Sequence, residues 1–166
     1  MIKRLISLLL LLSCLTGLVA CGDEEEGGFK TFTSEELSIT LSDSFYQAED
    51  PTSNLLLTNG KMTVSFKRLS FIDAEASGVS AAYSDVRFAN YFLQNSGIDS
   101  EVFMSGDTPY YTYYSEGETR LFCLASFYRT PYAYFILIFA TSADLERSAR
   151  DEIFAALKTV EYDIVD

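Results

Sequence analysis

The sequence of 166 residues lacks histidine and tryptophan altogether. Without histidine, Ser-His-Asp and Cys-His catalysis and imidazole ligation of zinc are excluded, so we expect no metal site and no cofactor. The absence of tryptophan argues against a sugar-binding platform of indole rings. A carboxylate pair is the only acid–base chemistry left open, and no motif among the 24 acidic residues indicates one. We therefore expect the chain not to be an enzyme, with a carboxylate-pair hydrolase as the enzymatic alternative.

Basic residues are scarce, because 12 Lys and Arg stand against 24 Asp and Glu and give a formal net charge of −12. An acidic surface repels phosphate backbones, so no nucleic-acid partner is expected. It also repels anionic lipid headgroups. Attachment to a membrane would therefore need something other than a basic patch.

The N-terminus has the parts of a secretory signal peptide. Met1 to Arg4 carries two basic residues, and an apolar segment from Leu5 to Gly17 follows. Next comes Leu18-Val19-Ala20-Cys21, which resembles the lipobox of bacterial lipoproteins. The resemblance implies that residues 1–20 are removed and that Cys21 is acylated, with a lipid membrane as its partner. The protein would then be extracytoplasmic and anchored to the cell membrane, or to the outer membrane or cell surface in a Gram-negative source.

Three other interpretations of this segment stay open. The apolar segment from Leu5 to Ala20 is 16 residues long, shorter than the about 20 residues that span a bilayer, which disfavours a permanent transmembrane helix. Cys14 also fits a loose lipobox, but cleavage there would leave apolar residues on the mature chain. Cleavage by an ordinary signal peptidase is the third alternative.

Residues 21–28 are expected to be a flexible tether, because four consecutive acids stand between glycines. Acids directly after a lipobox cysteine also resemble the surface-export signal of some Gram-negative gut bacteria. Removal of residues 1–20 leaves ten basic and 24 acidic residues, a formal charge of −14. Residues 29–166 are expected to form one globular domain without a disulfide framework. Cys123 lies in an apolar run and is predicted to be a buried core residue.

Alternating apolar and polar residues predict strands over 29–33 and 37–41. Residues 54–58 and 61–71 are predicted to form a hairpin around Asn59-Gly60, because both turn residues tolerate positive φ. Further strands are expected over 101–104, 110–115 and 120–129, and a short one over 160–164. Residues 132–140 are apolar on both faces, which predicts a central strand covered on both sides.

Two segments have the 3- to 4-residue spacing of amphipathic helices. The first covers residues 81–95 and stops at Gly97, and its predicted inner stripe is Ala82, Val86, Ala89 and Leu93, with Tyr83 and Phe92 alongside. The second runs from a cap at residues 141–144 to about Lys158, with Leu145, Ala149, Ile153 and Leu157 inward. Residues 73–78 are predicted to be a loop. Its acids superficially resemble a calcium loop, but Ser84 stands where the bidentate acid is required.

Tight turns between neighbouring strands predict the α+β class, with a largely antiparallel central sheet flanked by helices. The early hairpin, the helix that ends in Asn95-Ser96-Gly97 and the tyrosine-rich hairpin are together similar to the Mog1/PsbP-like α/β/α sandwich. The apolar strand, the Ser142-Ala143-Asp144-Leu145-Glu146 segment and the final Val160-Glu161-Tyr162 add to this resemblance. Lipid-anchored members of that group occur in bacteria, and the resemblance supplies no catalytic motif.

Tyrosines are concentrated between residues 110 and 134. On the strand over 110–115, Tyr110, Thr112 and Tyr114 should point to one face, and Tyr111 and Tyr113 to the other. Ordinary aromatic packing within the sheet is one interpretation. The alternative is a face on which Tyr110, Tyr111, Tyr113 and Tyr114, with Arg120 and Arg129, bind a small ligand or a protein partner. The expected function is therefore a non-enzymatic interaction or ligand-binding domain, with an accessory subunit of a membrane transporter or envelope complex as the alternative.

Overall fold

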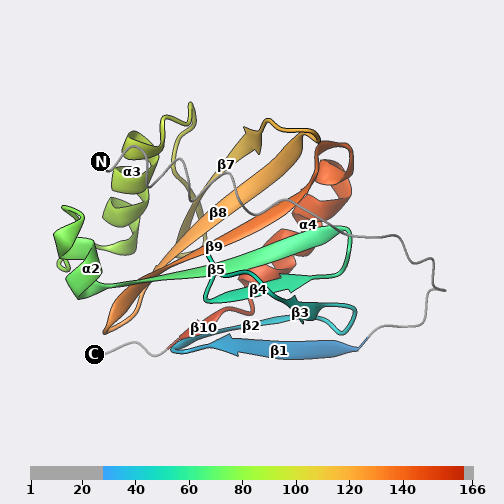
Figure 1. The fold of residues 1–166 in the computed structure, drawn as a ribbon, viewed down its shortest axis with the longest axis horizontal. Coiled ribbons are helices and arrows are strands. Elements are labelled where there is room, and N and C mark those ends of the chain that lie inside the picture. The colour runs from blue at the N-terminus through green and yellow to red at the C-terminus, as the bar shows by residue number, and fades with distance from the viewer. Residues whose placement is uncertain (1–27, 163–166) are drawn as a thin grey trace.

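A seven-stranded antiparallel sheet forms the centre of the protein (Figure 1). The structure is a computed structural model that describes residues 28–162, so the predicted signal peptide, Cys21 and the end of the last predicted strand lie outside the described residues. The strands, in their order across the sheet, are β3 (Tyr46–Ala48), β4 (Leu55–Thr58), β5 (Met62–Ser70), β9 (Ala133–Ser142), β8 (Leu121–Arg129), β7 (Thr108–Ser115) and β6 (Phe103–Ser105).

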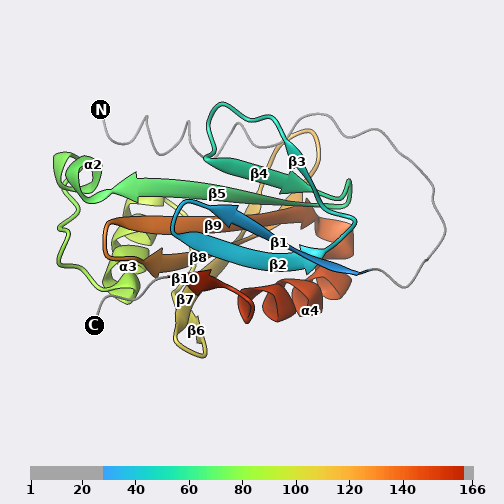
Figure 2. The same cartoon turned by 90° about the horizontal axis from the view of Figure 1, so that it is seen from below.

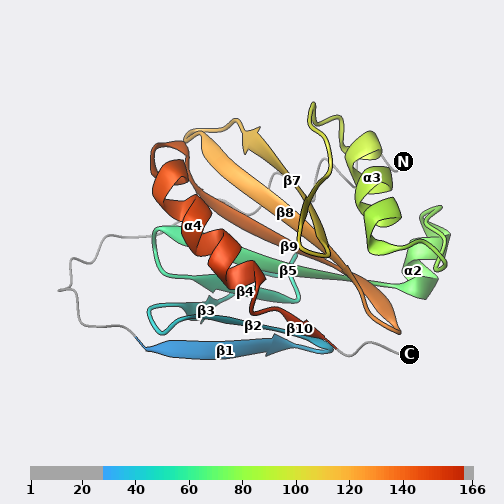
Figure 3. The same ribbon diagram turned by 180° about the vertical axis from the view of Figure 1, so that it is seen from behind.

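The two faces of this sheet are covered differently. One face carries α2 (Phe71–Ala76) and α3 (Asp85–Ser96). The other carries α4 (Glu146–Leu157), which follows the short 3-10 helix η1 (Ala143–Leu145), and a three-stranded sheet (Figures 2 and 3). That small sheet joins β1 (Phe29–Ser34) and β2 (Leu37–Ser42) to β10 (Glu161–Tyr162) near the end of the described chain. The predicted α+β class with a large antiparallel sheet is confirmed, and the small sheet shares one face with a helix.

Strand β9 divides the core into two halves, because its side chains alternate between the two faces. Tyr134, Ile136 and Ile138 belong to the cluster under α2 and α3. Phe135, Leu137 and Phe139 belong to the cluster under α4 and the small sheet. All six are buried, and β9 is the middle strand of seven. The prediction of a central strand covered on both sides is therefore confirmed.

The N-terminal boundary of α3 differs from the prediction. Ser84 caps the helix by accepting a hydrogen bond from the N–H of Arg87 at 3.3 Å, so the helix begins at Asp85. Phe88, Ala89 and Leu93 are buried against the sheet. The predicted inner stripe was wrong at Ala82, which precedes the helix, and at Val86, which lies in its first turn; both are exposed.

Two other helix predictions need correction. Residues 73–78 are not a loop throughout, because Ser70 caps a one-and-a-half-turn helix, α2, by accepting from the N–H of Asp73. Six residues are too few to reveal a helical period in the sequence. Leu145 does not face inward. It lies in η1 and is 39% exposed, because the 3-10 turn precedes α4 and rotates it away from the core.

The predicted Asn59-Gly60 hairpin joins β4 and β5 in antiparallel pairing. Only Gly60 has a positive φ, of 80°. Asn59 contributes through its side chain instead, because its Oδ1 accepts hydrogen bonds from the N–H groups of Lys61 and Met62 at 3.0 and 2.8 Å. The hairpin is confirmed, but the physical role assigned to Asn59 was wrong.

Arg68 on β5 ties the small sheet to the large one. Its guanidinium contacts the β1–β2 turn, with Nε 2.6 Å from Glu35 Oε2 and Nη2 2.9 Å from Glu36 Oε1. Glu35 in this turn has a positive φ of 53°. The hydrogen bond from Arg68 lowers the pKa of Glu36.

Glu36→Gln is expected to lower the free energy of unfolding at pH 7 by about 1 kcal/mol, because it removes a charge-assisted pair at a half-buried site. A carboxyl whose folded-state pKa is lowered stabilises the fold above its ordinary value, here 4.5, and loses this effect as the pH falls through the folded-state pKa. The difference between the variant and the wild type should therefore shrink towards pH 3. Urea unfolding at pH 7 and pH 3 measures it, with the exposed Glu49→Gln as control. A difference that persists undiminished at pH 3 would contradict the assignment.

Candidate functional site at the open edge of the sheet

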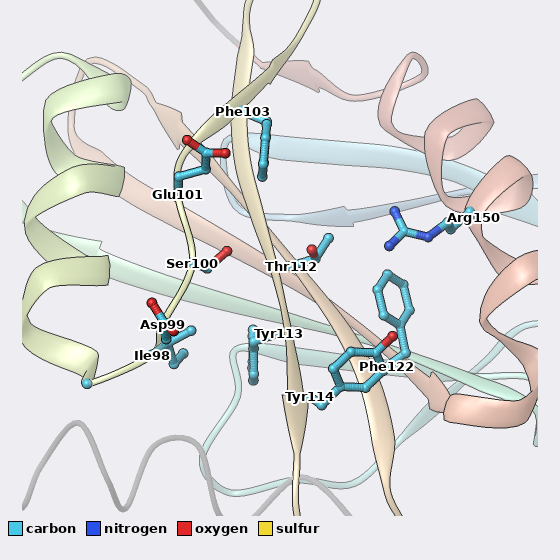
Figure 4. Close-up of a pocket in the computed structure, with 11 residues that line it drawn as sticks. Ile98, Asp99, Ser100, Glu101, Phe103, Thr112, Tyr113, Tyr114, Phe122 and Arg150 are labelled. Carbon is cyan, nitrogen blue, oxygen red and sulfur yellow. The ribbon is translucent and has the colours of Figure 1, made fainter.

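An open groove runs along the edge of the large sheet beyond Phe103, the first residue of β6. β6 pairs with β7 only from Phe103↔Tyr110 to Ser105↔Thr108, whereas β7 continues to Ser115 in pairing with β8. The groove of about 850 Å³ lies beside this continuation (Figure 4). Residues 97–101 and 112–114 line it, with Phe103, Phe122 and Arg150.

The tyrosines of β7 alternate between the two faces, as predicted, and the inner ones pack in the core. Tyr111 is buried under α3, with its ring centroid 5.4 Å from that of Phe127. Tyr110 faces the α4 side and meets the ring of Phe154 edge-on at 5.3 Å. Both faces of the strand are thus covered at this end. Tyr110 and Tyr111 are structural residues of the sheet, and the open part of β7 begins beyond them.

Tyr114 is the most accessible of these tyrosines and is held in a polar cluster. Its side chain is 43% exposed, and its hydroxyl donates a hydrogen bond to the carboxylate of Glu146 at the start of α4. The guanidinium of Arg120 lies over its ring at 4.2 Å from the centroid. The hydrogen bond raises the pKa of Tyr114 and lowers that of Glu146. The cluster therefore holds its ring in one position at the rim of the groove.

Arg150 forms the basic wall of the groove. Its Nη2 lies 2.7 Å from Glu146 Oε1, one turn earlier on α4, and its guanidinium lies 4.6 Å from the centroid of the Phe122 ring. Figure 4 shows it beside Phe122, on the side of β7 opposite the 98–101 segment. Sequence reasoning missed Arg150 and Phe122. The four-residue spacing from Glu146 could have indicated the ion pair, but the meeting with β8 depends on the tertiary fold.

The opposite wall is acidic. α3 ends at Ser96 and is capped by Gly97. The φ of Gly97, 74°, is left-handed, as predicted for the residue after this helix. The chain then turns along the edge of the sheet, with Ile98 packed against the cluster under α3. Asp99 and Glu101 are exposed on this segment and line the groove. The groove thus has carboxylates on one side and a guanidinium on the other.

The structure does not bring all six predicted residues together. Tyr113 and Tyr114 line the groove, and Arg120 lies over Tyr114. Arg129 is at the other end of β8, where its Nη2 donates to the carbonyl of Ala81 at 3.2 Å and its guanidinium lies over the ring of Phe71. It fixes the segment before α3 to the sheet.

Among residues 28–162, no group of three or more Cys, Asp and Glu residues is placed to hold a metal ion. Within the same part of the chain, no helix is long and apolar enough to cross a membrane. Three described carboxylates have a displaced pKa, those of Glu36, Asp50 and Glu146, and in each the pKa is lowered. A general acid requires the opposite direction, so none of these three is suited to that role.

No protein-family profile and no curated protein matches the chain. Solved structures do share its fold. The solution structure of the cyanobacterial PsbP protein CyanoP from Synechocystis aligns with a TM-score of 0.53 and 12% identity, over 88% of this chain and 99% of that one. A crystal structure from Bacteroides thetaiotaomicron aligns with a TM-score of 0.57 and 13% identity, over 84% of this chain. The chain spans about half of that second protein, 49% of its length. The predicted PsbP-like fold is thereby confirmed.

Proposed function

We propose that this protein is a membrane-anchored extracytoplasmic lipoprotein whose folded domain binds a partner without catalysis. The observation that carries the proposal is the groove at the open edge of β7. It combines an exposed aromatic residue, Tyr114, with charged walls formed by Arg150 and by Asp99 and Glu101. Rigid aromatic and arginine side chains at one place are typical of binding surfaces. The PsbP-like fold is compatible with such a role.

The proposed anchor is acylated Cys21, and the support comes from the sequence. A signal peptide and a lipobox precede the folded part, and the formal charge of the mature chain, −14, does not favour adsorption to anionic lipids. The acidic tether would hold the domain away from the bilayer and raise its concentration near other envelope proteins.

A protein segment fits the groove better than a small apolar ligand does. The groove is open along its length and is bordered by charges of both signs and by a strand edge. Small-molecule sites are more often enclosed and lined mainly by apolar side chains. This favours the accessory-subunit form of the function, in which the domain docks on a transporter or another envelope complex.

Site-specific photocrosslinking in intact cells tests the proposal. A photoreactive phenylalanine analogue at Tyr114 is expected to give discrete crosslinked products of higher mass. The matched control is the same analogue at Tyr46, which is 57% exposed on β3 at the opposite edge of the sheet. Products absent from position 114, or equally abundant from position 46, would contradict a binding role for the groove.

A further inference from the structure

Thr112 and Tyr114 of β7 present backbone hydrogen-bonding groups along the groove that no other residue among 28–162 pairs with. The two-residue connection Gly106-Asp107 closes the pair Ser105↔Thr108, and the φ of Gly106 is 60°. In such a hairpin the closing residues exchange backbone hydrogen bonds, and every second residue directs its backbone groups to the same side. The N–H and C=O groups of Thr112 and Tyr114 therefore point away from β8. Among residues 28–162, no backbone hydrogen bond reaches them from that side.

In the described part of the chain, this edge lacks some common features by which proteins protect an edge strand. Such edges carry lysine or proline, or are covered by a loop. Residues 111–115 contain neither residue type. The 98–101 segment precedes β6 and makes no backbone pairs with β7. The groove lies between that segment and β7 (Figure 4). A strand added beside β7 would continue the sheet about 4.8 Å from it.

The side chains beside the edge specify the charge pattern of an added strand. Arg150 and Arg120 lie on the α4 side, where each also contacts one carboxylate, of Glu146 and Glu116 respectively, while Asp99 and Glu101 line the groove from the segment that follows α3. Neighbouring residues of a strand point to opposite faces. A complementary segment would therefore carry acidic side chains on one face and basic side chains on the other.

We infer that the β7 edge binds an extended segment of a partner protein by antiparallel strand addition, and that this segment alternates acidic with basic residues. Its acidic side chains lie on the α4 face near Arg150, and its basic side chains lie near Asp99 and Glu101. The backbone of Thr112 and Tyr114 supplies the hydrogen bonds. The inference rests on the proposed binding function and names the kind of partner.

A second copy of this chain fits the edge less well. Antiparallel pairing of two β7 edges about a twofold axis keeps each face of the sheet on the same side. Arg150 and Arg120 would then lie on the same face as their own copies, as would the acidic walls. Like charges oppose that association, and the formal charge of −14 on each mature chain increases the repulsion.

Binding of a designed peptide to the full-length chain in detergent tests the inference. The probe is acetyl-Thr-Glu-Lys-Val-Lys-Glu-Thr-amide, which has its acids on one face and its lysines on the other. The control, acetyl-Thr-Glu-Glu-Val-Lys-Lys-Thr-amide, has the same composition with mixed faces. Binding of the probe is expected to be about tenfold tighter, from several favourable charge contacts. Equal affinity would overturn the proposed charge pattern.

N-methylation of the probe identifies strand addition. In an antiparallel pair, opposed side chains share a face, so the Glu and Val residues of the probe direct their N–H groups at β7. Methylation of the valine amide should weaken binding about tenfold or more, because it removes a hydrogen bond and introduces a clash. Methylation of the first lysine amide should have little effect. Equal affinities of the two methylated peptides, or weaker binding of the lysine-methylated one, would overturn antiparallel addition.

Variants of the chain give a second test. Thr112→Pro removes an outward N–H without touching the pairs with β8, and should weaken binding about tenfold. Thr112→Ala also loses the threonine side chain but keeps the N–H, so Thr112→Pro should bind more weakly than Thr112→Ala if the backbone hydrogen bond contributes. Glu101→Lys reverses one exposed wall charge and should weaken binding about threefold. Full binding by both Thr112→Pro and Glu101→Lys would overturn the site. Crosslinks from Tyr114 in cells, combined with failure of all the peptide tests, would leave the proposed function intact and refute strand addition.

Discussion

Cys21→Ala is expected to abolish lipid labelling of the protein and to remove nearly all of it from the membrane fraction. Two acyl chains, at about 0.8 kcal/mol for each buried methylene, suffice for stable anchoring. Electrostatic adsorption to anionic lipids is not expected to replace the anchor, because acidic residues outnumber basic ones twofold. Metabolic labelling with an alkyne fatty acid, followed by fractionation, measures both effects.

Two cysteine controls separate the rival interpretations of the N-terminus. Cys14→Ala should leave labelling unchanged, because the proposed cleavage removes this residue with the signal peptide. Cys123→Ala should also leave it unchanged, because this thiol is buried in β8. Labelling that survives Cys21→Ala but disappears with Cys14→Ala would move the lipobox to the earlier cysteine. Absence of labelling from the wild type and from the variants would favour cleavage by an ordinary signal peptidase.

Local patterns in the sequence predicted the parts of the fold that depend on neighbouring residues. The apolar run that became β9, the Asn59-Gly60 hairpin and the stop at Gly97 were each correct. Alternation along β7 also predicted that Tyr110 and Tyr111 face opposite sides. Such features follow from strand and turn geometry, which act over a few residues.

Features that depend on distant segments could not be predicted in this way. The small sheet joins residues 29–42 to β10, more than a hundred positions later. The groove likewise depends on how far β6 follows β7 and on where α4 places Arg150. Arg129 and Arg120 are both near tyrosines in the sequence, but the full length of β8 separates them: Arg120 directly precedes this strand and Arg129 is its last residue. Proximity to tyrosines in the sequence therefore did not show which of the two arginines lies near the groove.

Phe88→Ala is expected to lower the free energy of unfolding by about 3–5 kcal/mol, the usual cost of removing a buried phenylalanine ring. Phe88 is fully buried and holds α3 on the sheet. Its ring stacks on that of Tyr134 with centroids 4.2 Å apart and meets Phe127 edge-on at 5.6 Å. Urea unfolding measures the loss.

The matched control lies two positions earlier on the same helix. Val86 belongs to the stripe that the sequence pattern placed inward, yet it is 36% exposed. Val86→Ala should therefore change the free energy of unfolding by less than about 0.5 kcal/mol, as is usual for surface substitutions. Comparable losses in the two variants would contradict the packing of α3, in which Phe88 faces the sheet and Val86 does not. The segment that carries Asp99 and Glu101 follows α3 directly, so loss of α3 packing in Phe88→Ala should also disturb the acidic wall of the groove.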